Sequence, residues 1–252
     1  MNCTDLVFDL YGTLVEIHTE ETGEVWEETA RYFTAHGAAM NGPDLFAAFR
    51  QELARRNAAA GQSYECFPEI PFDEVMDTQY RRRGGTETGF GLAAARHFRS
   101  LSTEYIRLYP GVLEALRALR GAGYRLWLLT NAQRAFTELE LEQLGLADAF
   151  DGVYISSDFG FRKPDTRFFK ALIEAEGIDK SQALMIGNDR QTDIAGAKKA
   201  GLATLYMHTN ITPPGQSPAS PALFPGVLDE DIREYEYEGS NWDELKEIVA
   251  GL

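Results

Sequence analysis

The sequence predicts an α/β fold with a parallel sheet as its core and a helical module inserted after the first strand. From residue 109 onward, apolar strand-like runs alternate with amphipathic helical segments, and crossover units of this kind build parallel sheets. Between the first strand and that point, helical periodicity dominates and strand-like runs are few. The chain opens on an apolar run at 6–8 that ends abruptly at Asp9. Open parallel sheets bind their ligands at the carboxyl ends of such strands.

The division into a core and an inserted module follows from this change of pattern. We expect residues 1–15 and 109–252 to form the core and residues 16–108 to form the helical module. At 252 residues, with 44% hydrophobic side chains, the chain has ample apolar material for both. The expected helices of the module cover residues 21–36, 43–60, 71–83 and 88 onward, with an irregular loop at 59–71.

The core should alternate helices and strands along the chain. Its later strands are expected at 125–131, 152–156, 183–187 and 203–208, and its helices at 110–122, 136–144, 166–177 and 194–200. Prolines make 212–225 a surface loop without regular pairing, and the alternating run at 235–238 that follows predicts an edge strand. Ser240 is expected to cap a final helix over 241–249.

Charge and cysteine content argue against several classes of protein. The formal net charge of -15 repels polyanions, so neither nucleic acid nor an anionic membrane surface is expected as the main partner. No run is long and apolar enough to span a bilayer, and the first residues predict no signal peptide. Cys3 and Cys66 form no CxxC pair, which leaves a disulfide or zinc framework unsupported. We therefore expect a cytoplasmic protein; a monomer fits the sequence, which leaves the oligomeric state open.

The residues after the first strand carry the first chemical signal. Asp9 is followed by Gly12 and Thr13, so a carboxylate, a glycine and a hydroxyl come together at the end of the strand. We take Asp9 as the candidate nucleophile, because the carboxyl ends of parallel strands form the ligand crevice. The competing interpretation is a turn or helix cap, where Asp and Thr are common.

Two further carboxylates, Asp189 and Asp193, lie where the strand at 183–187 gives way to a helix. Together with Asp9 they would supply the oxygen ligands that Mg²⁺ prefers. The alternative is that both acids cap the helix and complement its dipole. Capping explains one acid readily and two less well.

Polar residues also follow two other predicted strands. Thr130 and Asn131 close the strand at 125–131, and Lys163 precedes the helix at 166–177. Hydroxyls and amides at strand ends hold phosphoryl oxygens, and a lysine beside the nucleophile neutralises the charge that develops during attack. Each residue alone is ordinary, since turn formers and solvated lysines are common. Their order along the chain, acid, hydroxyl, lysine and acid pair, indicates one active site.

In these residues the chain resembles the haloacid dehalogenase superfamily. The four motifs of that superfamily match Asp9-Leu10-Tyr11-Gly12-Thr13, Thr130-Asn131, Lys163-Pro164 and Gly187-Asn188-Asp189 through Asp193. The resemblance implies a Rossmann-like core with the helical module as a mobile cap domain over the site. It also implies a covalent intermediate on Asp9 that water hydrolyses, and a Mg²⁺ held by Asp9, the carbonyl of Tyr11 and the acid pair.

Tyr11 departs from the phosphatases of that superfamily, which usually carry a second aspartate there to protonate the leaving oxygen and then activate water. A phenol, with an ordinary pKa near ~10, can donate a proton but is seldom ionised at neutral pH. The dehalogenases proper also have Asp-x-Tyr-Gly-Thr, and a departing halide needs no proton. They lack the metal-binding acids, however, whereas Asp189 and Asp193 are retained here. Their carboxylate-binding arginine has no clear counterpart either, since Arg31 lies in that region without the expected neighbours.

We therefore expect a Mg²⁺-dependent phosphohydrolase that acts on a small phosphate ester. Its candidate catalytic residues are Asp9, Tyr11, Thr130, Asn131 and Lys163, its metal ligands Asp9, Tyr11, Asp189 and Asp193, and its substrate-binding residues Thr130, Asn131 and Lys163. The first alternative is a metal-independent 2-haloacid dehalogenase. The second is a catalytically weak binding or regulatory module, which Tyr11 supports and the retained charged residues oppose.

Specificity is expected from the helical module and from the residues just after the nucleophile, notably Glu16, His18 and the basic run Arg81-Arg82-Arg83. The basic run would suit a second anionic group of the substrate. Dipole complementarity and solvation at a helix end explain the same run more simply. His18 is more typical of a surface residue, and we assign it no role.

Overall fold

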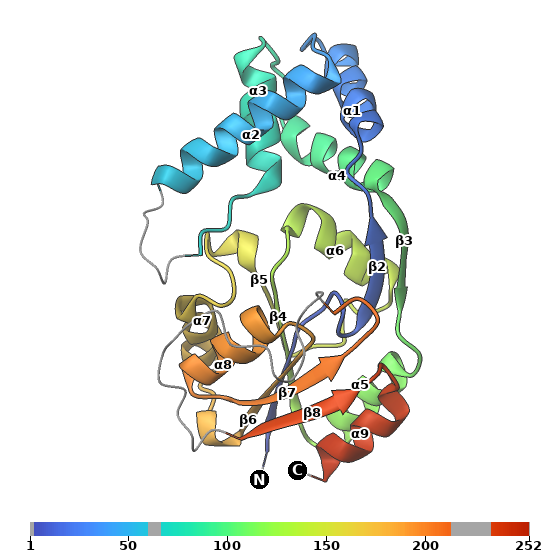
Figure 1. The fold of residues 1–252 in the computed structure, drawn as a ribbon, viewed down its shortest axis with the longest axis vertical. Helices are drawn as coiled ribbons and strands as arrows, with labels where there is room; N and C mark the ends of the chain where they lie inside the picture. Colours follow the sequence, from blue (N-terminus) through green and yellow to red (C-terminus); the bar gives the residue numbers. More distant parts are fainter. Residues whose placement is uncertain (1–2, 60–66, 213–232, 252) are drawn as a thin grey trace.

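The computed structural model describes residues 3–59, 67–212 and 233–251, and its core is a parallel sheet covered by helices (Figure 1). Within these residues the sheet has six strands in the order β5-β4-β1-β6-β7-β8, and every neighbouring pair is parallel. The strands are β1 (Asp5–Phe8), β4 (Arg125–Thr130), β5 (Gly152–Ile155), β6 (Ala183–Gly187), β7 (Ala203–His208) and β8 (Glu234–Glu238). The central place of β1 suits its apolar run, since such strands are buried on both faces.

Side chains of β1 point alternately to two hydrophobic clusters, one on each face of the sheet. Leu6 and Phe8 belong to the cluster that α5, α6 and α9 cover, and Val7 belongs to the one under α7 and α8. These helices are α5 (Val112–Gly121), α6 (Arg134–Gln143), α7 (Thr166–Glu176), α8 (Ala195–Ala200) and α9 (Trp242–Ala250). Because both faces are covered, a ligand meets the sheet at the carboxyl ends of its strands.

The helical module packs around a hydrophobic cluster of its own, at the end of the molecule far from α9 (Figure 1). Aromatic rings dominate this cluster: the ring centroids of Trp26 and Phe98 lie 4.7 Å apart, and Tyr80 stacks on Phe90 at 3.6 Å. The helices of the module are α1 (Gly23–Ala35), α2 (Gly42–Ala59), α3 (Phe72–Arg82) and α4 (Phe90–Ser102).

Two antiparallel strands, β2 (Val15–Thr19) and β3 (Thr103–Leu108), connect the helical module to the core. The sequence pattern did not predict this ribbon, because each strand is short and its partner lies at the other end of the module. Val15 pairs with Leu108, so the chain enters and leaves the module side by side. The ribbon therefore joins the module directly to the loop that follows β1.

Most other elements lie within a few residues of their predicted bounds. β6 and β7 match the prediction, and β8 lies at the end of the sheet, which confirms an edge strand there. The helix expected at 194–200 is preceded by a π-helical turn, Arg190–Ile194. The proposed cap at Ser240 is wrong: α9 begins at Trp242, so Asn241 occupies the capping position and its side chain accepts a hydrogen bond from a backbone N–H.

Some predictions fall on parts of the chain that the structure does not describe. These are the predicted loop at 212–225 beyond its first residue, Cys66, and most of the loop at 59–71. In the parts that are described, no helix combines the length and the apolar character needed to cross a membrane.

Glu52 is a buried acid of α2 that gathers three arginines. Its carboxylate accepts hydrogen bonds from Arg55 at 2.6 Å, Arg56 at 3.0 Å and Arg82 at 2.9 Å. The hydrogen bond from Arg55 is the largest of the effects that lower the pKa of Glu52 to about 2. Arg82 belongs to the basic run that was considered for substrate binding, and here it is paired with Glu52 inside the module.

We expect Glu52→Gln to lower the free energy of unfolding by about 1 kcal/mol at neutral pH. The effect stays modest because Arg55 and Arg82 are 61% and 51% exposed, and water weakens their ion pairs. The folded-state pKa lies below the ordinary 4.5, so the stabilisation is present above about 4.5 and is lost as the pH falls toward 2. Denaturant unfolding at several pH values, with the exposed Glu24→Gln as control, measures this. A deficit that stays constant from neutral to acidic pH would contradict the assignment.

Candidate active site

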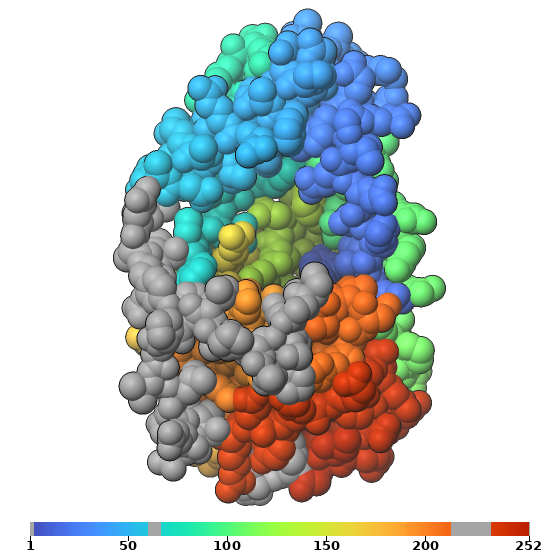
Figure 2. All heavy atoms as spheres, viewed as in Figure 1, coloured from blue at the N-terminus to red at the C-terminus, as the bar shows by residue number. Residues whose placement is uncertain are grey.

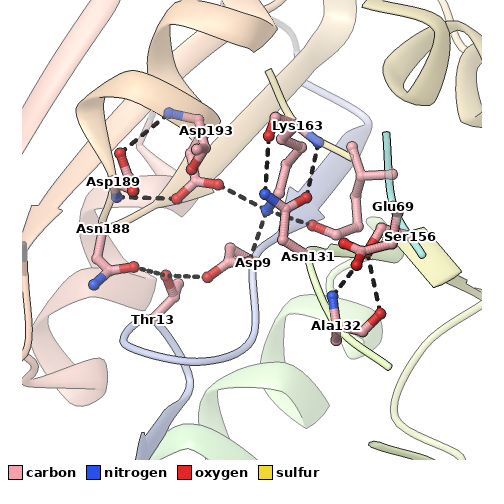
Figure 3. Close-up of polar contacts among 12 residues, drawn as sticks. Asp9, Thr13, Glu69, Asn131, Ala132, Ser156, Lys163, Asn188, Asp189 and Asp193 are labelled. Carbon is pink, nitrogen blue, oxygen red and sulfur yellow. Dashed lines mark hydrogen bonds and ion pairs between the residues drawn. The ribbon is translucent and has the colours of Figure 1, made fainter. Parts of the chain in front are cut away.

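Polar side chains from four strand ends meet at the carboxyl edge of the sheet (Figure 3). Asp9 follows β1, Asn131 follows β4, and Asp189 follows β6. Lys163 comes from the loop after β5, which leads into α7. The structure thus brings together residues that lie far apart in the sequence, at the edge where a parallel sheet binds ligands.

Asp9 is held on both its backbone and its carboxylate. Its N–H donates to the carbonyl of Ile186 on β6 at 3.0 Å. Its Oδ1 accepts a hydrogen bond from Lys163 Nζ at 2.6 Å, and Thr13 Oγ1 lies 3.4 Å from its Oδ2. Asp9 is only 7% exposed, and that exposed surface lines a cavity of about 210 Å³. The carboxylate is therefore fixed in direction and reachable from one side.

The loop after Asp9 requires a glycine at position 12. Gly12 has a φ of 86°, a conformation that side chains disfavour, and a Cβ there would lie 2.1 Å from Asn188 Nδ2. Thr209 Oγ1, just beyond β7, donates to the carbonyl of Gly12 at 2.7 Å. The loop is thereby packed against the loops after β6 and β7.

Lys163 is the buried centre of the site. Its Nζ donates to Asp9 Oδ1 at 2.6 Å and to the carbonyl of Leu129 at 2.8 Å, and it lies 2.7 Å from Asp193 Oδ1. Asn131 fixes the backbone of Lys163, because its Oδ1 accepts from the Lys163 N–H at 2.8 Å and its Nδ2 donates to the Lys163 carbonyl at 2.9 Å. In this conformation Asn131 positions the lysine, with one amide hydrogen left for a ligand.

The two acids after β6 have different environments. Asp189 caps the π-helical turn, since its Oδ1 accepts from the N–H groups of Gln191 and Thr192 at 2.7 and 3.1 Å. Asp193 Oδ2 accepts from the Asp189 N–H at 3.0 Å, and its Oδ1 faces Lys163. A Cβ on Gly187 would lie 2.3 Å from Asp193 Oδ2, so the glycine makes room for this acid. The capping interpretation thus applies to Asp189, and Asp193 belongs to the charged centre.

Negative charge exceeds positive charge in this cavity. Burial is the main reason that the pKa of Asp193 rises to about 7, and the charges of Asp9 and Asp189 add to the rise, although Lys163 opposes it. Within the described part of the chain, no three Asp, Glu, His or Cys side chains lie spaced to grip a metal as they stand. Lys163 bridges two of the acids instead. The oxygen donors and the surplus negative charge nevertheless fit a hard divalent cation such as Mg²⁺.

Thr130 ends β4 with its side chain fully buried. Among the described residues its Oγ1 has no hydrogen-bond partner. A buried hydroxyl without a partner costs about 1–3 kcal/mol relative to a satisfied one, so this atom is a candidate for a ligand contact. Asn131, the next residue, does line the cavity.

The phenol of Tyr11 is turned toward helix α6 and does not complete an acid–base pair with Asp9. Its hydroxyl hydrogen-bonds Thr137 at 3.0 Å and donates to Glu140, while Arg99 of the helical module lies 5.7 Å from the ring centroid. Burial, followed by the charge of Glu140, raises the pKa of Tyr11 far above its ordinary value. In the structure this side chain anchors the loop after β1 to α6 and α4, although Tyr11 also lines the cavity at Asp9, and its expected catalytic role stays a prediction.

The comparison with known families decides the identity of the chain. A model described as haloacid dehalogenase-like hydrolase matches residues 6–201. The chain belongs to this family of hydrolases. The family match and the observed sheet confirm the α/β fold and the resemblance in the motifs.

Relatives of this haloacid dehalogenase-like hydrolase carry the names of phosphatases. The chain is 38% identical to the pyrimidine 5'-nucleotidase YjjG of Escherichia coli, over 43% of this chain and 49% of the relative. It is 41% identical to a phosphoglycolate phosphatase of Mesorhizobium japonicum, over 42% of this chain and 46% of the relative. The chain thus spans about half the length of the curated relatives it matches.

Solved structures share the fold at lower identity. A 2-haloacid dehalogenase from Pseudomonas syringae pv. Tomato DC3000 superposes with a TM-score of 0.63 at 21% identity, covering 99% of both chains. At this identity the likeness concerns the fold alone. The choice between phosphatase and dehalogenase chemistry depends on the residues of the site.

A second, larger cavity adjoins the first in this hydrolase. It measures about 440 Å³ and shares Asn131, Lys163 and Thr192 with the lining of the smaller one. Glu69 and Gln133 also line it, and Figure 2 shows the surface hollowed between the helical module and the core. No sequence pattern pointed to Glu69, because it lies in an irregular segment that only the folded module brings to the core.

Glu16 and His18, which were considered for specificity, and Arg31, which was considered as a carboxylate-binding arginine, lie elsewhere. Glu16 is bound to Arg107 of the ribbon at 2.7 Å and to Asn210 at 2.6 Å. His18 pairs with exposed acids such as Glu20, and Arg31 pairs with Glu28 on the surface of α1. None of Glu16, His18 and Arg31 is among the described residues that line the two cavities.

Proposed function

We propose that this hydrolase is a Mg²⁺-dependent phosphohydrolase that acts on a small phosphate ester through an aspartyl-phosphate on Asp9. The observation that carries the proposal is the shared cavity, in which the Asp9 carboxylate meets Lys163 and the acids Asp189 and Asp193. The phosphatase names of the relatives support it. The proposal includes a cytoplasmic location and a small soluble substrate.

In the first step Asp9 attacks the phosphorus atom, and the bond from phosphorus to the leaving oxygen breaks. The leaving oxygen departs with the electron pair of that bond and takes up a proton from solvent water. The Lys163 ammonium, fixed 2.6 Å from Asp9, offsets the negative charge that gathers around the phosphoryl group. Water then attacks the same phosphorus, which releases inorganic phosphate and restores the Asp9 carboxylate.

The remaining residues bind and orient in this scheme. The Thr130 hydroxyl and the free amide hydrogen of Asn131 donate to phosphoryl oxygens. Asp9, the carbonyl of Tyr11 and Asp189 would hold the metal, with Asp193 assisting, and Mg²⁺ when bound supplies positive charge to the phosphoryl oxygens. We also propose that residues 16–108 act as a cap over the core formed by 1–15 and 109–252.

A panel of hydrolysis rates tests the function. p-Nitrophenyl phosphate and 2-chloropropionate are each incubated with wild type and Asp9→Asn, in Mg²⁺ and in excess EDTA. We expect phosphate release only from wild type in Mg²⁺. Chloride release that is unaffected by EDTA, without phosphatase activity, would instead establish the dehalogenase. Tyr11 is the reason to test this second function. Its phenol is already hydrogen-bonded, so the site has no obvious acid to protonate a poor leaving group.

Tyr11 also leads to a separate prediction about turnover. Without an aspartate at position 11, phosphoryl transfer from p-nitrophenyl phosphate should be fast and hydrolysis of the intermediate slow, which gives a burst. We expect Tyr11→Asp to raise the steady-state rate by about 10²-fold, the lower range of general acid–base help, and to remove the burst. Stopped-flow traces measure both quantities.

Tyr11→Phe is the matched control for this prediction. It removes the hydrogen bonds to Thr137 and Glu140 but adds no base, so the steady-state rate should not rise. A wild type without a burst, together with a Tyr11→Asp variant that is no faster, would show that another group already performs the proton transfers.

A further inference from the structure

The segment of the helical module before α3 brings a carboxylate to the edge of the active site. Residues 67–70 run beside the loop that leads to Lys163: Pro68 forms a bridge with Phe161, and the Glu69 N–H donates to the carbonyl of Gly160 at 3.0 Å. On the other side of the bridge, Arg162 donates its N–H to the carbonyl of Phe67 at 2.9 Å. Backbone pairing therefore fixes Glu69 relative to the catalytic lysine.

The Glu69 side chain is fixed as well. Its Oε1 accepts from Gln133 Nε2 at 2.8 Å, and Ser156 Oγ donates to its Oε2 at 3.0 Å (Figure 3). Gln133 is itself held, because its Oε1 accepts from the Phe72 N–H at 2.8 Å. Two residues of the core thus orient one acid of the module toward the cavity of about 440 Å³ that continues from the active site.

The surroundings of this acid neutralise its charge only in part. Within the described part of the chain, Glu69 makes no ion pair, and its two direct side-chain partners are neutral. Burial raises the pKa of the Glu69 carboxyl, and the nearby Arg162 offsets only part of the rise. A half-buried carboxylate with spare lone pairs gains from a donor or a cation and disfavours a second anion.

We propose that Glu69 is a specificity-determining residue, and that it selects phosphate esters whose leaving group carries hydroxyl or ammonium donors rather than a second acidic group. The inference deepens the proposed function and depends on it. The phosphoryl group would lie in the smaller cavity at Asp9, and the leaving group in the larger one at Glu69. The size of the larger cavity, about 440 Å³, suits a leaving group of the size of a sugar. Arg162 also lines the larger cavity, but its side chain is exposed, so water screens its charge and we expect it not to reverse the preference.

Three esters of matched chain length provide the test: glucitol 6-phosphate, glucosamine 6-phosphate and 6-phosphogluconate. We expect wild type to have a kcat/KM at least about tenfold higher for the first two than for the acid, which corresponds to about one hydrogen bond to a charged group. In Glu69→Gln this ratio should fall about tenfold, because the amide no longer repels the carboxylate. The rate with p-nitrophenyl phosphate, which has no such groups, is measured for each variant as a reference, so that a general loss of activity is separated from a change in the ratio.

Two control variants accompany this test. Glu74→Gln changes an exposed acid of the same module that pairs with Arg56 outside the cavity, and it should leave the ratio unchanged. Glu69→Asp keeps the charge and should keep the discrimination against the acid, even where the loss of contacts lowers thermal stability.

The outcomes separate this inference from the proposed function. An unchanged ratio in Glu69→Gln, or a wild-type preference for 6-phosphogluconate, would overturn the role of Glu69 while Asp9-dependent hydrolysis of p-nitrophenyl phosphate still stood. The absence of any Asp9-dependent phosphate release would overturn the proposed function itself, and the inference with it.

Discussion

Lys163→Met should lower the free energy of unfolding by about 3–5 kcal/mol, the usual cost of leaving a buried charge without its partner. Methionine fills much of the space of the lysine, but it cannot donate to Asp9, to Asp193 or to the carbonyl of Leu129. Phosphatase activity should fall by at least about 10³-fold, since both the charge and its placement are lost. Urea unfolding and initial rates measure the two effects.

The pH dependence identifies the cause of this loss of stability. The pKa of Asp193 already rises to about 7 in the presence of the ammonium, and removing Lys163 must raise it further. A carboxyl with a raised pKa destabilises the folded protein least when it is protonated. The loss in free energy of unfolding caused by Lys163→Met should therefore shrink as the pH falls. Lys170→Met, an exposed change on α7, should show neither effect. A deficit independent of pH would mean that lost packing, not unpaired charge, destabilises the variant.

Asp189→Asn should lose metal-dependent activity by at least about 10²-fold while the fold is kept. The asparagine Oδ1 can still accept from the N–H groups of Gln191 and Thr192, so the cap of the π-helical turn survives. Only the negative charge disappears, and with it one oxygen ligand of the proposed Mg²⁺. The dependence of the rate on Mg²⁺ concentration, measured beside thermal unfolding, separates the two roles of this residue.

Asp179→Asn is the matched control for this change. Asp179 also caps a short turn, since its Oδ1 accepts from the N–H of Ser181 at 3.0 Å, but it is not among the residues that line the active-site cavity. It should leave the Mg²⁺ dependence unchanged. Full activity in Asp189→Asn, with an unaltered Mg²⁺ requirement, would remove this acid from the metal site.

The sequence predicted the part of the site that local patterns encode. The apolar run of β1 placed Asp9 at a strand end, and the order of the motifs placed Lys163 in the loop after β5 and the two later acids after β6. The distances among them depend on the register of the parallel strands, which no local pattern contains. The sequence indicated the members of the charged centre, and the fold supplied the contact between Lys163 and Asp193.

Interactions between distant elements lay beyond the sequence pattern. The direction of the Tyr11 phenol depends on Thr137 and Glu140 of α6, which lie more than a hundred positions later in the chain. It also depends on Arg99 of α4, which belongs to the helical module. The ribbon of β2 and β3 was missed for the same reason. Glu69 gains its place only when the module packs against Gln133 and Ser156.

The central claim is that Asp9 becomes phosphorylated during turnover, and rapid-quench mass spectrometry tests it most directly. Wild-type enzyme is mixed with p-nitrophenyl phosphate and Mg²⁺, stopped in acid within the burst, and digested. The peptide that contains Asp9 should carry the added mass of one phosphoryl group, and the same peptide from Asp9→Asn should not. Product release without a phosphorylated peptide at any time, or a phosphoryl group on a different residue, would contradict the account.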